Sequence, residues 1–571
     1  MNSTCSLRIH PLVARITAIL SVTALIACSE GPELVPQDAN PDTRLTPDAM
    51  IADAMADTRA DADVPTWRSA LYPEDWAPGS LDSEGRGLHD FSYAGYRHGQ
   101  APPSPLDSDL PSYDVSDFGA DPSGATDSTS AIQAAIDAAT EGGTINIPPG
   151  LFRIDGELVV RSSNTLLHGA GPDLTRLHFT TSRDRSYKAH LSFLGNTAHD
   201  AEIPLAEDEA TRSMQVRVMD AGDLAPGDDI SIGWTITEEF VEDHGMTGTW
   251  QAFNGRWQPF FWRTIISIDR SATPHRITID VPLRSAALLR DSPSLRRHPG
   301  LLSEVGIEDV GVSNAVGWSD AWSEDQVHAI GLDGVKDAWV RRVESFVSPS
   351  APASGDGSGA HLQSSGILVK RAMRVSVLES RMEFAQHRGG GGNGYLFEVR
   401  QSSEVLFQDC VARAGRHGFI QNWGFGATGI VWSRVHSLEG RSFFSPDSPI
   451  SQAGFSEFHH SLATANLIDQ SRFDDGWSAV NRGDYSSGAG HSATETVFYN
   501  SSGSGSLRSA QYGWGYVIGT SPEINIVTRP FSTARQGTEP EDFVEGAGLG
   551  QGLQPPSLYE DQRRRRLSLS D

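Results

Sequence analysis

Cysteine, basic charge and long apolar runs are all scarce in this sequence of 571 residues. Only three cysteines occur, at positions 5, 28 and 410, which excludes a disulfide-rich scaffold. The net charge is −28, and because nucleic acid requires a basic surface we expect no nucleic-acid partner. After the N-terminal segment that ends at Cys28, no apolar run approaches the length of a membrane-spanning helix. The 57 glycines and a fair supply of Val, Ile, Leu and aromatic residues indicate a loop-rich chain with a sizeable core.

Residues 1–28 form a predicted bacterial lipoprotein signal peptide. Arg8 and Arg15 precede the apolar stretch from Ile16 to Ala27, which is too short to cross a bilayer. The stretch ends in Leu-Ile-Ala-Cys, which resembles a lipobox, whose cysteine becomes the lipidated first residue of the mature chain. We therefore predict lipidation at Cys28 and an extracytoplasmic protein held on a bacterial membrane (outer membrane or cell surface) by lipid alone. An ordinary secretory signal is the alternative.

Both ends of the remaining chain look unlike a folded domain. Residues 29–65 carry alternating Ala and Asp and few large apolar side chains, which predicts a disordered acidic tether. Residues 561–571 include the basic run from Arg563 to Arg566, which we expect to be a solvated tail. Cys410, within the strand-like VLFQDCVA, is expected to lie in the core.

Tyr113 to Gly169 contains the most specific pattern. Turn residues lead into a helix predicted to start near Asp127 or Ser128. TINIPPGLFRI and ELVV then alternate apolar and polar residues, as half-buried strands do. This stretch resembles the N-terminal signature of the pectate-lyase superfamily, in the branch of rhamnogalacturonase-like and epimerase-like proteins. The resemblance implies a right-handed parallel β-helix, with this helix capping its first coil. The apolar stripe of the helix consists of Ala131, Ile132, Ala135, Ile136 and Ala139.

An apolar–x–apolar pair recurs through the second half of the chain. The spacing of its middle positions is loose, shortest from Phe407 to Trp432 and longest from Val340 to Val377. This recurrence predicts an all-β chain with stacked parallel coils in a domain at 110–560. The middle positions are Val312, Val340, Val377, Phe407, Trp432 and, more weakly, Ile468. Most are preceded by a second strand, starting at Ile330, Ile367, Phe397 and Phe458.

The coil pattern stops between Gly169 and Val305, and we predict a β-rich insertion at 170–300. Segments 213–234 and 263–283 alternate like antiparallel strands around an aromatic-rich middle. Aromatic planes suit the C–H faces of sugar rings, so we predict that tryptophans of this middle bind substrate. The alternative is that they form the small core of the insertion. The tryptophans are Trp250, Trp257 and Trp262.

Residues 385–399 (AQHRGGGGNGYLFEV) contain four consecutive glycines after a His-Arg pair. His387 and His417 are separated by the same number of residues as Val377 and Phe407, which are successive coil positions. Equal offsets predict that the two histidines lie in register, about 4.8 Å apart, with Arg388 and Arg416 beside them. Glycine there allows close approach of backbone or ligand and predicts the floor of a groove. A flexible loop beside a structural histidine ladder is the alternative.

Ionisable side chains concentrate between Glu383 and His491, which favours an enzyme. β-Elimination on a uronic-acid, pectin-like polysaccharide needs a base, a cation for the substrate carboxylate and an acid for the leaving oxygen. Histidine, arginine and tyrosine fill these roles, and the resemblance implies that Ca²⁺ often assists in related families. The histidine spacings match no metal-ligand motif. We predict a lyase acting with His387, Arg388, Tyr395, Arg416, His417, His459, Arg482 and Tyr485.

Two other functions stay open at this point. Glycoside hydrolysis needs two carboxyl groups. Asp474-Asp475-Gly476 and Gly490-His491 resemble elements of polygalacturonases, although the Asn-Thr-Asp and Arg-Ile-Lys elements of that family are absent from the sequence. A non-catalytic glycan-binding surface protein is the second alternative, because an acidic tether and surface aromatic residues suit a binder as well.

Overall fold

The computed structural model describes residues 65–571, except 104–109, 449, 531–538 and 569–571. Cys28, the signal peptide and the tether up to residue 64 lie outside these residues. Val64–Asp571 forms one compact unit. Within the described ranges, no helix has both the length and the apolar character needed to span a bilayer.

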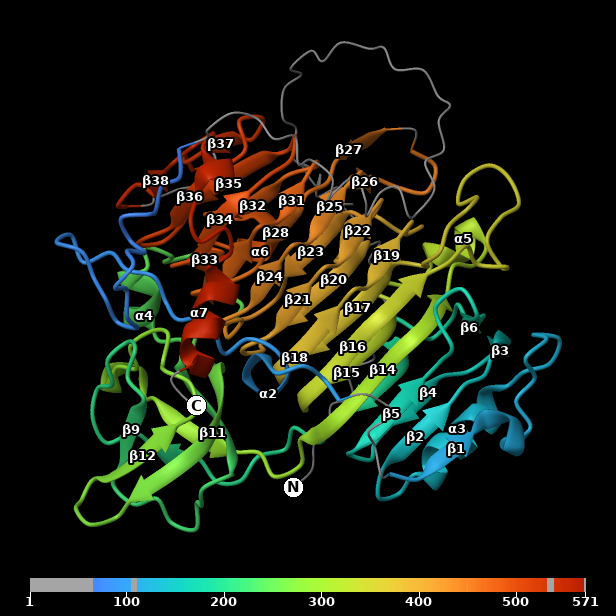
Figure 1. Cartoon of the computed structure of the whole chain (residues 1–571), viewed down its shortest axis with the longest axis horizontal. Helices are drawn as coiled ribbons and strands as arrows, with labels where there is room; N and C mark the ends of the chain where they lie inside the picture. The colour runs from blue at the N-terminus through green and yellow to red at the C-terminus, as the bar shows by residue number, and fades with distance from the viewer. Residues whose placement is uncertain (1–64, 104–109, 449, 531–538, 569–571) are drawn as a thin grey trace, which may run out of the picture. The chain divides into compact units, whose positions relative to one another are not determined.

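Stacked coils of parallel strands make up most of this unit (Figure 1). A ten-stranded parallel sheet takes one strand from each coil, in chain order. Its strands are β4 (Leu158–Val160), β7 (Ala189–Leu194), β15 (His328–Asp333), β17 (Ser365–Lys370), β20 (Tyr395–Arg400), β23 (His417–Gln421), β28 (Ser456–Phe458), β32 (Trp477–Val480), β35 (Ser506–Ala510) and β37 (Asn525–Val527).

An 18-stranded parallel sheet supplies the remaining walls of the coils. Side chains from both sheets fill one hydrophobic core, so the fold is the predicted parallel β-helix. The strands are β1 (Ser112–Asp114), β2 (Gly143–Asn146), β3 (Gly150–Ile154), β5 (Thr165–His168), β6 (Thr175–Phe179), β14 (Leu302–Ser313), β16 (Val335–Ser345), β18 (Met373–Leu378), β19 (Arg381–Glu383), β21 (Leu406–Gln408), β22 (Val411–Arg413), β24 (Val431–Ser433), β25 (His436–Leu438), β30 (Leu467–Asp469), β31 (Arg472–Phe473), β34 (Val497–Ser501), β36 (Tyr516–Thr520) and β38 (Phe543–Glu545).

The predicted register holds over five coils of the larger sheet. Val340, Val377, Phe407, Trp432 and Ile468 pair in succession, and all five are buried in the same core. Stacked large side chains continue this order, with the Phe407 and Trp432 ring centres 5.9 Å apart and the ring planes nearly parallel. The recurring apolar pair in the sequence therefore corresponds to the side chains that point into the core in successive coils.

The register prediction is wrong at two places. Ile307, not Val312, stacks on Val340, because β14 is a long strand with two apolar pairs and the spacing alone could not choose between them. Phe458 pairs with Gln421, one inward position later than predicted, because the connection from this strand to β30 is longer than those from β17 to β18 and from β20 to β21. Both errors arise where the length of a strand or of a connection differs between coils.

Helix α3 (Thr129–Ala138) closes the first coil, as predicted. It buries Ile132, Ala135 and Ile136, three members of the predicted stripe, in the common core. The other short helices lie in turns. They are α2 (Tyr96–Gly99), η2 (Val115–Phe118), η3 (Leu289–Asp291), α5 (Trp318–Ala321), α6 (Tyr485–Gly488) and η4 (Gly550–Gly552).

A six-stranded antiparallel sheet interrupts the coils and has its own core. The sequence placed this insertion at 170–300, but β6 and β7 pair with later coils, so the inserted sheet begins at β8. Helix α4 (Glu238–Asp243) belongs to the same region. The strands are β8 (Ile203–Pro204), β9 (Gln215–Val218), β10 (Asp229–Thr235), β11 (Trp257–Asp269), β12 (His275–Ile279) and β13 (Ser294–Arg297).

The basic run at the C-terminus is not a solvated tail. It lies in helix α7 (Leu558–Ser568), beside the larger sheet (Figure 1). Arg563 donates to the Gly99 carbonyl oxygen (2.6 Å), and Arg566 donates to that of Ser92 (3.0 Å). These carbonyls belong to the segment before β1, which packs Tyr72 and other apolar side chains against α7 and the last coils. The arginines therefore satisfy backbone acceptors of a segment for which the sequence analysis predicted no structure.

Candidate active site

The glycine-rich stretch is an insertion in one turn of the helix. A short turn, 414–416, separates β22 from β23, whereas the much longer turn 384–394 separates β19 from β20. Tyr395 therefore pairs with His417 across neighbouring coils, and His387 does not. The predicted register of His387 and His417 is wrong because it assumed that the two turns have equal lengths, whereas the turn that contains His387 is longer. His387 instead stacks on Trp322, with ring centres 4.1 Å apart.

The glycines let this turn fold tightly against its neighbours. Gly391, Gly392 and Gly394 have φ angles of 80°, 90° and 78°, in the left-handed region that side chains disfavour. The buried Asn393 amide holds the turn by donating to Asp325 Oδ1 (2.7 Å) and to the Gly390 carbonyl oxygen (2.8 Å). The turn is thus a fixed element rather than a loose loop.

Five of the predicted catalytic residues meet a glutamate that the sequence analysis did not select. We call this group the histidine–glutamate cluster. The rings of Tyr395 and His417 are 5.2 Å apart, and those of His417 and His459 are 5.7 Å apart. The Arg416 guanidinium lies 6.0 Å from the centre of the Tyr395 ring. The cluster consists of Tyr395, Arg416, His417, Glu457, His459 and Arg482.

Glu457 is the centre of the cluster. Phe458, its neighbour in β28, points into the core, so the Glu457 side chain points to the opposite face of the sheet. There its Oε1 contacts His459 Nδ1 and lies 3.3 Å from His417 Nε2, and its Oε2 pairs with Arg482. Its side chain is only 1% exposed, so this carboxylate is compensated entirely by protein groups.

The protonation states follow from burial and these partners. Burial lowers the pKa of His417 to about 3 and that of His459 to about 4, so both imidazoles are neutral at pH 7. Burial alone favours a protonated Glu457, but Arg482 and the two imidazoles outweigh it and hold the pKa of Glu457 well below its usual 4.5. Burial raises the pKa of the Tyr395 phenol to about 12, so it keeps its proton.

The hydrogen bonds fix the tautomers of both histidines. His459 donates its Nδ1 proton to Glu457, so Nε2 carries the lone pair. His417 Nδ1 donates to the Phe455 carbonyl oxygen (2.6 Å), and its buried Nε2 has no hydrogen-bond partner among the described residues. His459 therefore presents an unprotonated Nε2 atom, whereas the Nε2 atom of His417 faces Glu457 Oε1 at 3.3 Å. Arg416 is held by one donation, from Nη1 to the Gly389 carbonyl oxygen of the glycine turn (2.9 Å), and pairs with no carboxylate in the described part of the chain.

A second buried carboxylate lies further along the same sheet. Glu398 accepts hydrogen bonds from His328 Nε2 and Asn422 Nδ2, each at 2.8 Å, and pairs with Arg400. Burial favours its protonated form, but Arg400 and His328 outweigh it and hold its pKa far below the usual value. Glu398 is therefore ionised and saturated by its partners, which makes it a structural anchor for this face.

The remaining predicted residues lie outside the cluster. His387 pairs with Asp325, Arg388 stacks on Phe443, and Tyr485 starts α6 in the turn after Arg482. Trp250 is 1% exposed in the core of the insertion and donates to the Ala489 carbonyl oxygen, so it offers no face to a sugar. Trp250 is therefore part of the core of the insertion, which was the alternative to substrate binding.

Trp257 and Trp262 line a cavity of about 230 Å³ between the insertion and the coils. Arg296 covers the Trp257 ring at 3.6 Å, and Trp262 is buried and donates to the Gln401 carbonyl oxygen. Of the three tryptophans, Trp257 is the one that keeps a partly exposed face at this cavity.

The donor atoms of His417, Glu457 and His459 lie within 4.8 Å of one another. This set does not fit Ca²⁺, which takes about six to eight oxygen ligands. Zn²⁺ accepts such donors, but here Arg482 and the Nδ1 proton of His459 already compensate the carboxylate. We therefore assign the cluster to proton transfer and derive no step through a metal.

The sequence analysis did not select Glu457, because a glutamate next to a buried phenylalanine in a strand is usually solvent-exposed. The available signal was the Glu-x-His spacing at the end of one short strand, because residues two apart in extended chain lie on one face. Its burial depends on Tyr395 and His417 from neighbouring coils, which no local pattern reports.

Comparison with known proteins extends the sequence resemblance. Residues 112–237 match the family described as rhamnogalacturonase A/epimerase, pectate lyase-like. Alginate lyase 7 of Azotobacter vinelandii is 40% identical over 101 residues, 16% of this chain and 12% of that protein. Mannuronan C5-epimerase AlgE3 of the same organism is 47% identical over 68 residues, 10% of this chain and 4% of that protein. The chain thus spans a small part of the length of these relatives.

Among solved structures, the mannuronan C-5 epimerase AlgE4 A-module of Azotobacter vinelandii shares 13% identity, with a TM-score of 0.34 over 76% of this chain and 96% of that one. The tailspike gp61 of Pseudomonas phage phi297 shares 14% identity, with a TM-score of 0.40 over 76% of this chain and 72% of that one. Residues 112–237 of this chain are similar to the rhamnogalacturonase A/epimerase, pectate lyase-like family, in line with the resemblance of the first coil.

Proposed function

We propose that this polysaccharide-active protein cleaves a uronic-acid polymer by β-elimination at the histidine–glutamate cluster. The Glu457–His459 pair carries the proposal. A buried carboxylate holds the Nδ1 proton of a neutral imidazole, which orients the ring and leaves Nε2 free to accept a proton. His459, one of the three histidines that the sequence analysis selected, takes the role of base.

The other members of the cluster supply what elimination needs. Arg416 has no carboxylate partner among the described residues and is positioned to bind the substrate carboxylate. The protonated Tyr395 phenol, between His417 and His459, is the proton donor for the leaving oxygen. His417 is a second neutral imidazole that lines the site.

The electron balance of the step is simple. His459 Nε2 takes the proton from the carbon next to the substrate carboxylate, and the C–H electron pair becomes a carbon–carbon double bond. The glycosidic C–O bond on the next carbon then breaks, and its oxygen takes the Tyr395 proton. Arg416 stabilises the negative charge that builds on the carboxylate during proton removal.

The relatives support a uronate polymer as substrate class. One is named as an alginate lyase and one as a mannuronan C5-epimerase, and both alginate and mannuronan are uronate polymers. Pectin-like polymers, the substrate predicted from the sequence, and alginate are therefore the first substrates to test.

The test is a polysaccharide panel with the full chain. We expect an unsaturated, ultraviolet-absorbing product from at least one uronate polymer and none from the His459→Ala variant. Solvent deuterium taken up without chain cleavage would instead indicate epimerisation. New reducing ends without unsaturation would indicate hydrolysis. In that case Asp475, which burial gives a raised pKa of about 7, is the first acid to examine. Retention on a glycan without turnover would indicate a binder.

We also propose that Cys28 carries a lipid anchor on the outside of a bacterial membrane. The lipobox-like Leu-Ile-Ala-Cys at the end of an apolar stretch supports this. Palmitate labelling should mark the wild-type chain and fail to mark Cys28→Ala. A labelled variant would place the lipid elsewhere.

A further inference from the structure

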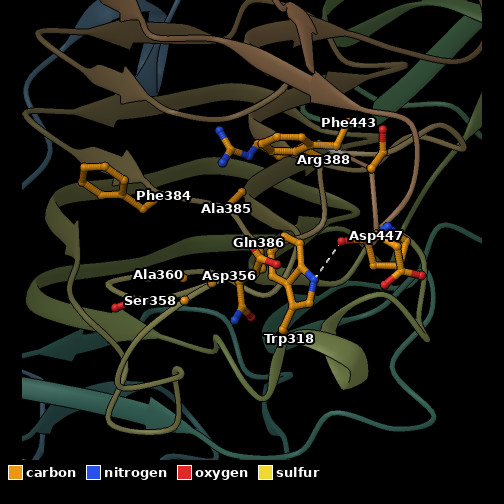
Figure 2. Close-up of a pocket in the computed structure, with 14 residues that line it drawn as sticks. Trp318, Asp356, Ser358, Ala360, Phe384, Ala385, Gln386, Arg388, Phe443 and Asp447 are labelled. Carbon is orange, nitrogen blue, oxygen red and sulfur yellow. Dashed lines mark hydrogen bonds between the residues drawn. The ribbon is translucent and has the colours of Figure 1, made fainter. Parts of the chain in front are cut away.

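A cavity of about 400 Å³ lies beside the first residues of the glycine turn, and no residue of the histidine–glutamate cluster lines it. Its walls come from four segments that are distant in sequence: the start of α5, the segment 355–360, residues 384–388, and the end of β26 (Arg441–Phe443) with the loop after it. Figure 2 shows Trp318, Asp447, Arg388 and Phe443 around it. None of these four side chains belongs to the histidine–glutamate cluster.

Two fixed aromatic rings line the cavity. Trp318 is half-buried, and its Nε1 donates to the Pro446 carbonyl oxygen at 3.1 Å (dashed in Figure 2), which locks the indole plane. Phe443 lies under the Arg388 guanidinium, whose central carbon is 4.5 Å from the ring centre. Rigid, partly exposed aromatic planes suit the C–H faces of a sugar ring and cost little ordering entropy on binding.

Arg388 is a cation without a carboxylate partner in the described part of the chain. Its Nε is buried and has no hydrogen-bond partner there. Asp356 and Asp447 also line the cavity but form no ion pair with it. Burial, together with nearby Arg441, lowers the pKa of the guanidinium to about 10, and Glu439, which pairs with Arg413, offsets this only in part. A half-buried guanidinium without a carboxylate partner is stabilised by a carboxylate ligand that offers two oxygens.

The cavity and the cluster meet at Gly394. A Cβ atom placed there would lie 3.0 Å from Arg388 Cγ and 2.9 Å from Arg416 Cβ. The two arginine side chains therefore pass the same point of the turn, with Arg388 lining the cavity and Arg416 over Tyr395. The cavity and the cluster are therefore adjacent at this point of the turn.

We propose that this cavity is a subsite that binds a further uronate residue of the polymer, outside the residue that reacts. Arg388 binds the carboxylate of that residue, Trp318 and Phe443 pack against its ring, and Asp356 and Asp447 accept hydrogen bonds from its hydroxyl groups. This assignment rests on the proposed function for the identity of the polymer. It predicts that binding depends on charge at the cavity.

The test measures binding without turnover, in full-length protein carrying His459→Ala. Oligosaccharides from alginate and polygalacturonate are titrated calorimetrically, together with carboxyl-reduced forms of the same chains. Adding Arg388→Gln should weaken binding of the acidic chains about 10- to 100-fold, the usual effect of losing one charge-assisted hydrogen-bonded contact. The carboxyl-reduced chains should bind equally to both proteins.

Two further variants keep the result interpretable. Ser358→Trp, on the exposed rim, fills the cavity without touching the core and should weaken binding similarly, even if Arg388→Gln folds poorly. Arg153→Gln removes a partly exposed arginine paired with Asp155 in the first coils and should bind like the parent protein. Equal loss for acidic and carboxyl-reduced chains, or no loss with Arg388→Gln and Ser358→Trp, overturns the subsite.

The outcomes separate this inference from the proposed function. Binding of acidic chains that depends on Arg388, with no unsaturated product from the wild type, supports the subsite and refutes the lyase. Normal cleavage with no effect of Arg388→Gln on binding or on KM supports the lyase and refutes the subsite. No binding to any acidic chain refutes both.

Discussion

Replacing Glu457 by glutamine tests the centre of the site, because it removes one charge and almost no volume. The carboxylate is 1% exposed and is shared by Arg482, His417 and His459. Loss of one partner of a buried ion pair costs about 3–5 kcal/mol. Arg482 remains 13% exposed and also donates to Ser486, so we expect the lower end, about 3 kcal/mol of unfolding free energy.

The effect of Glu457→Gln on catalysis should exceed its effect on folding. An amide no longer selects the Nδ1 proton of His459, so the ring loses its fixed tautomer and orientation. We expect kcat to fall by a factor on the order of 10²–10⁴, the usual contribution of a positioned general base. Initial rates of unsaturated product and urea denaturation of the same samples measure the two effects.

The pH profile distinguishes positioning from a general loss of structure. In the wild type, the His459 pKa of about 4 keeps the base unprotonated at all higher pH values, so kcat/KM should be flat from pH 8 down to about pH 5. Glu457 is one of the groups that raise this pKa, so the acid limb should move to lower pH in Glu457→Gln. Initial rates in short assays after a pH jump measure the position of this acid limb.

Asp409→Asn is the matched control, because Asp409 is 41% exposed and pairs with Arg434 at the surface. It should cost less than about 1 kcal/mol and leave kcat unchanged. An acid limb near 6.5 in the wild type, or full kcat in Glu457→Gln, refutes the assignment of His459 as a base held by Glu457.

Three further predictions concern stability, metal dependence and pH. Trp432→Ala, in the common core against Phe407 and Trp477, should lower the unfolding free energy by about 3–5 kcal/mol; a loss below about 1 kcal/mol by urea denaturation would mean that this core is not close-packed. Dialysis against EDTA should leave kcat unchanged, because the cluster does not fit Ca²⁺ and its carboxylate is compensated by Arg482 and His459. Activity that is lost on dialysis and restored by one added ion would contradict the assignment of the cluster to metal-free proton transfer. Burial lowers the pKa values of nine histidines in the described chain from 6.5 to about 3 or 4. Below about pH 6.5 these histidines bind protons in the unfolded chain but not in the folded chain, so the melting temperature should fall as the pH drops towards 4. A constant melting temperature across this range would contradict the prediction.

The architecture of this protein was predictable from its sequence. Inward side chains of a β-helix repeat once per coil, so apolar pairs at Val340, Val377 and Phe407 were enough to predict the stack and most of its register. The capping helix was equally predictable, since its apolar stripe is a local pattern with helical spacing. When one face of a helix or strand is buried, apolar residues recur in the sequence at the spacing of that element. This spacing can be recognised without the rest of the chain.

Which ionisable residues meet depends on the folded chain as a whole. Sequence spacing paired His387 with His417, but the long turn 384–394 displaces His387 and brings Tyr395 beside His417 instead. Glu457 becomes a buried, ionised centre only because Arg482 and two histidines surround it. The arginines of α7, near the C-terminus, likewise find their acceptors in the segment before β1. Contacts between coils depend on the lengths of the turns between strands, and these lengths follow no period that a single sequence displays.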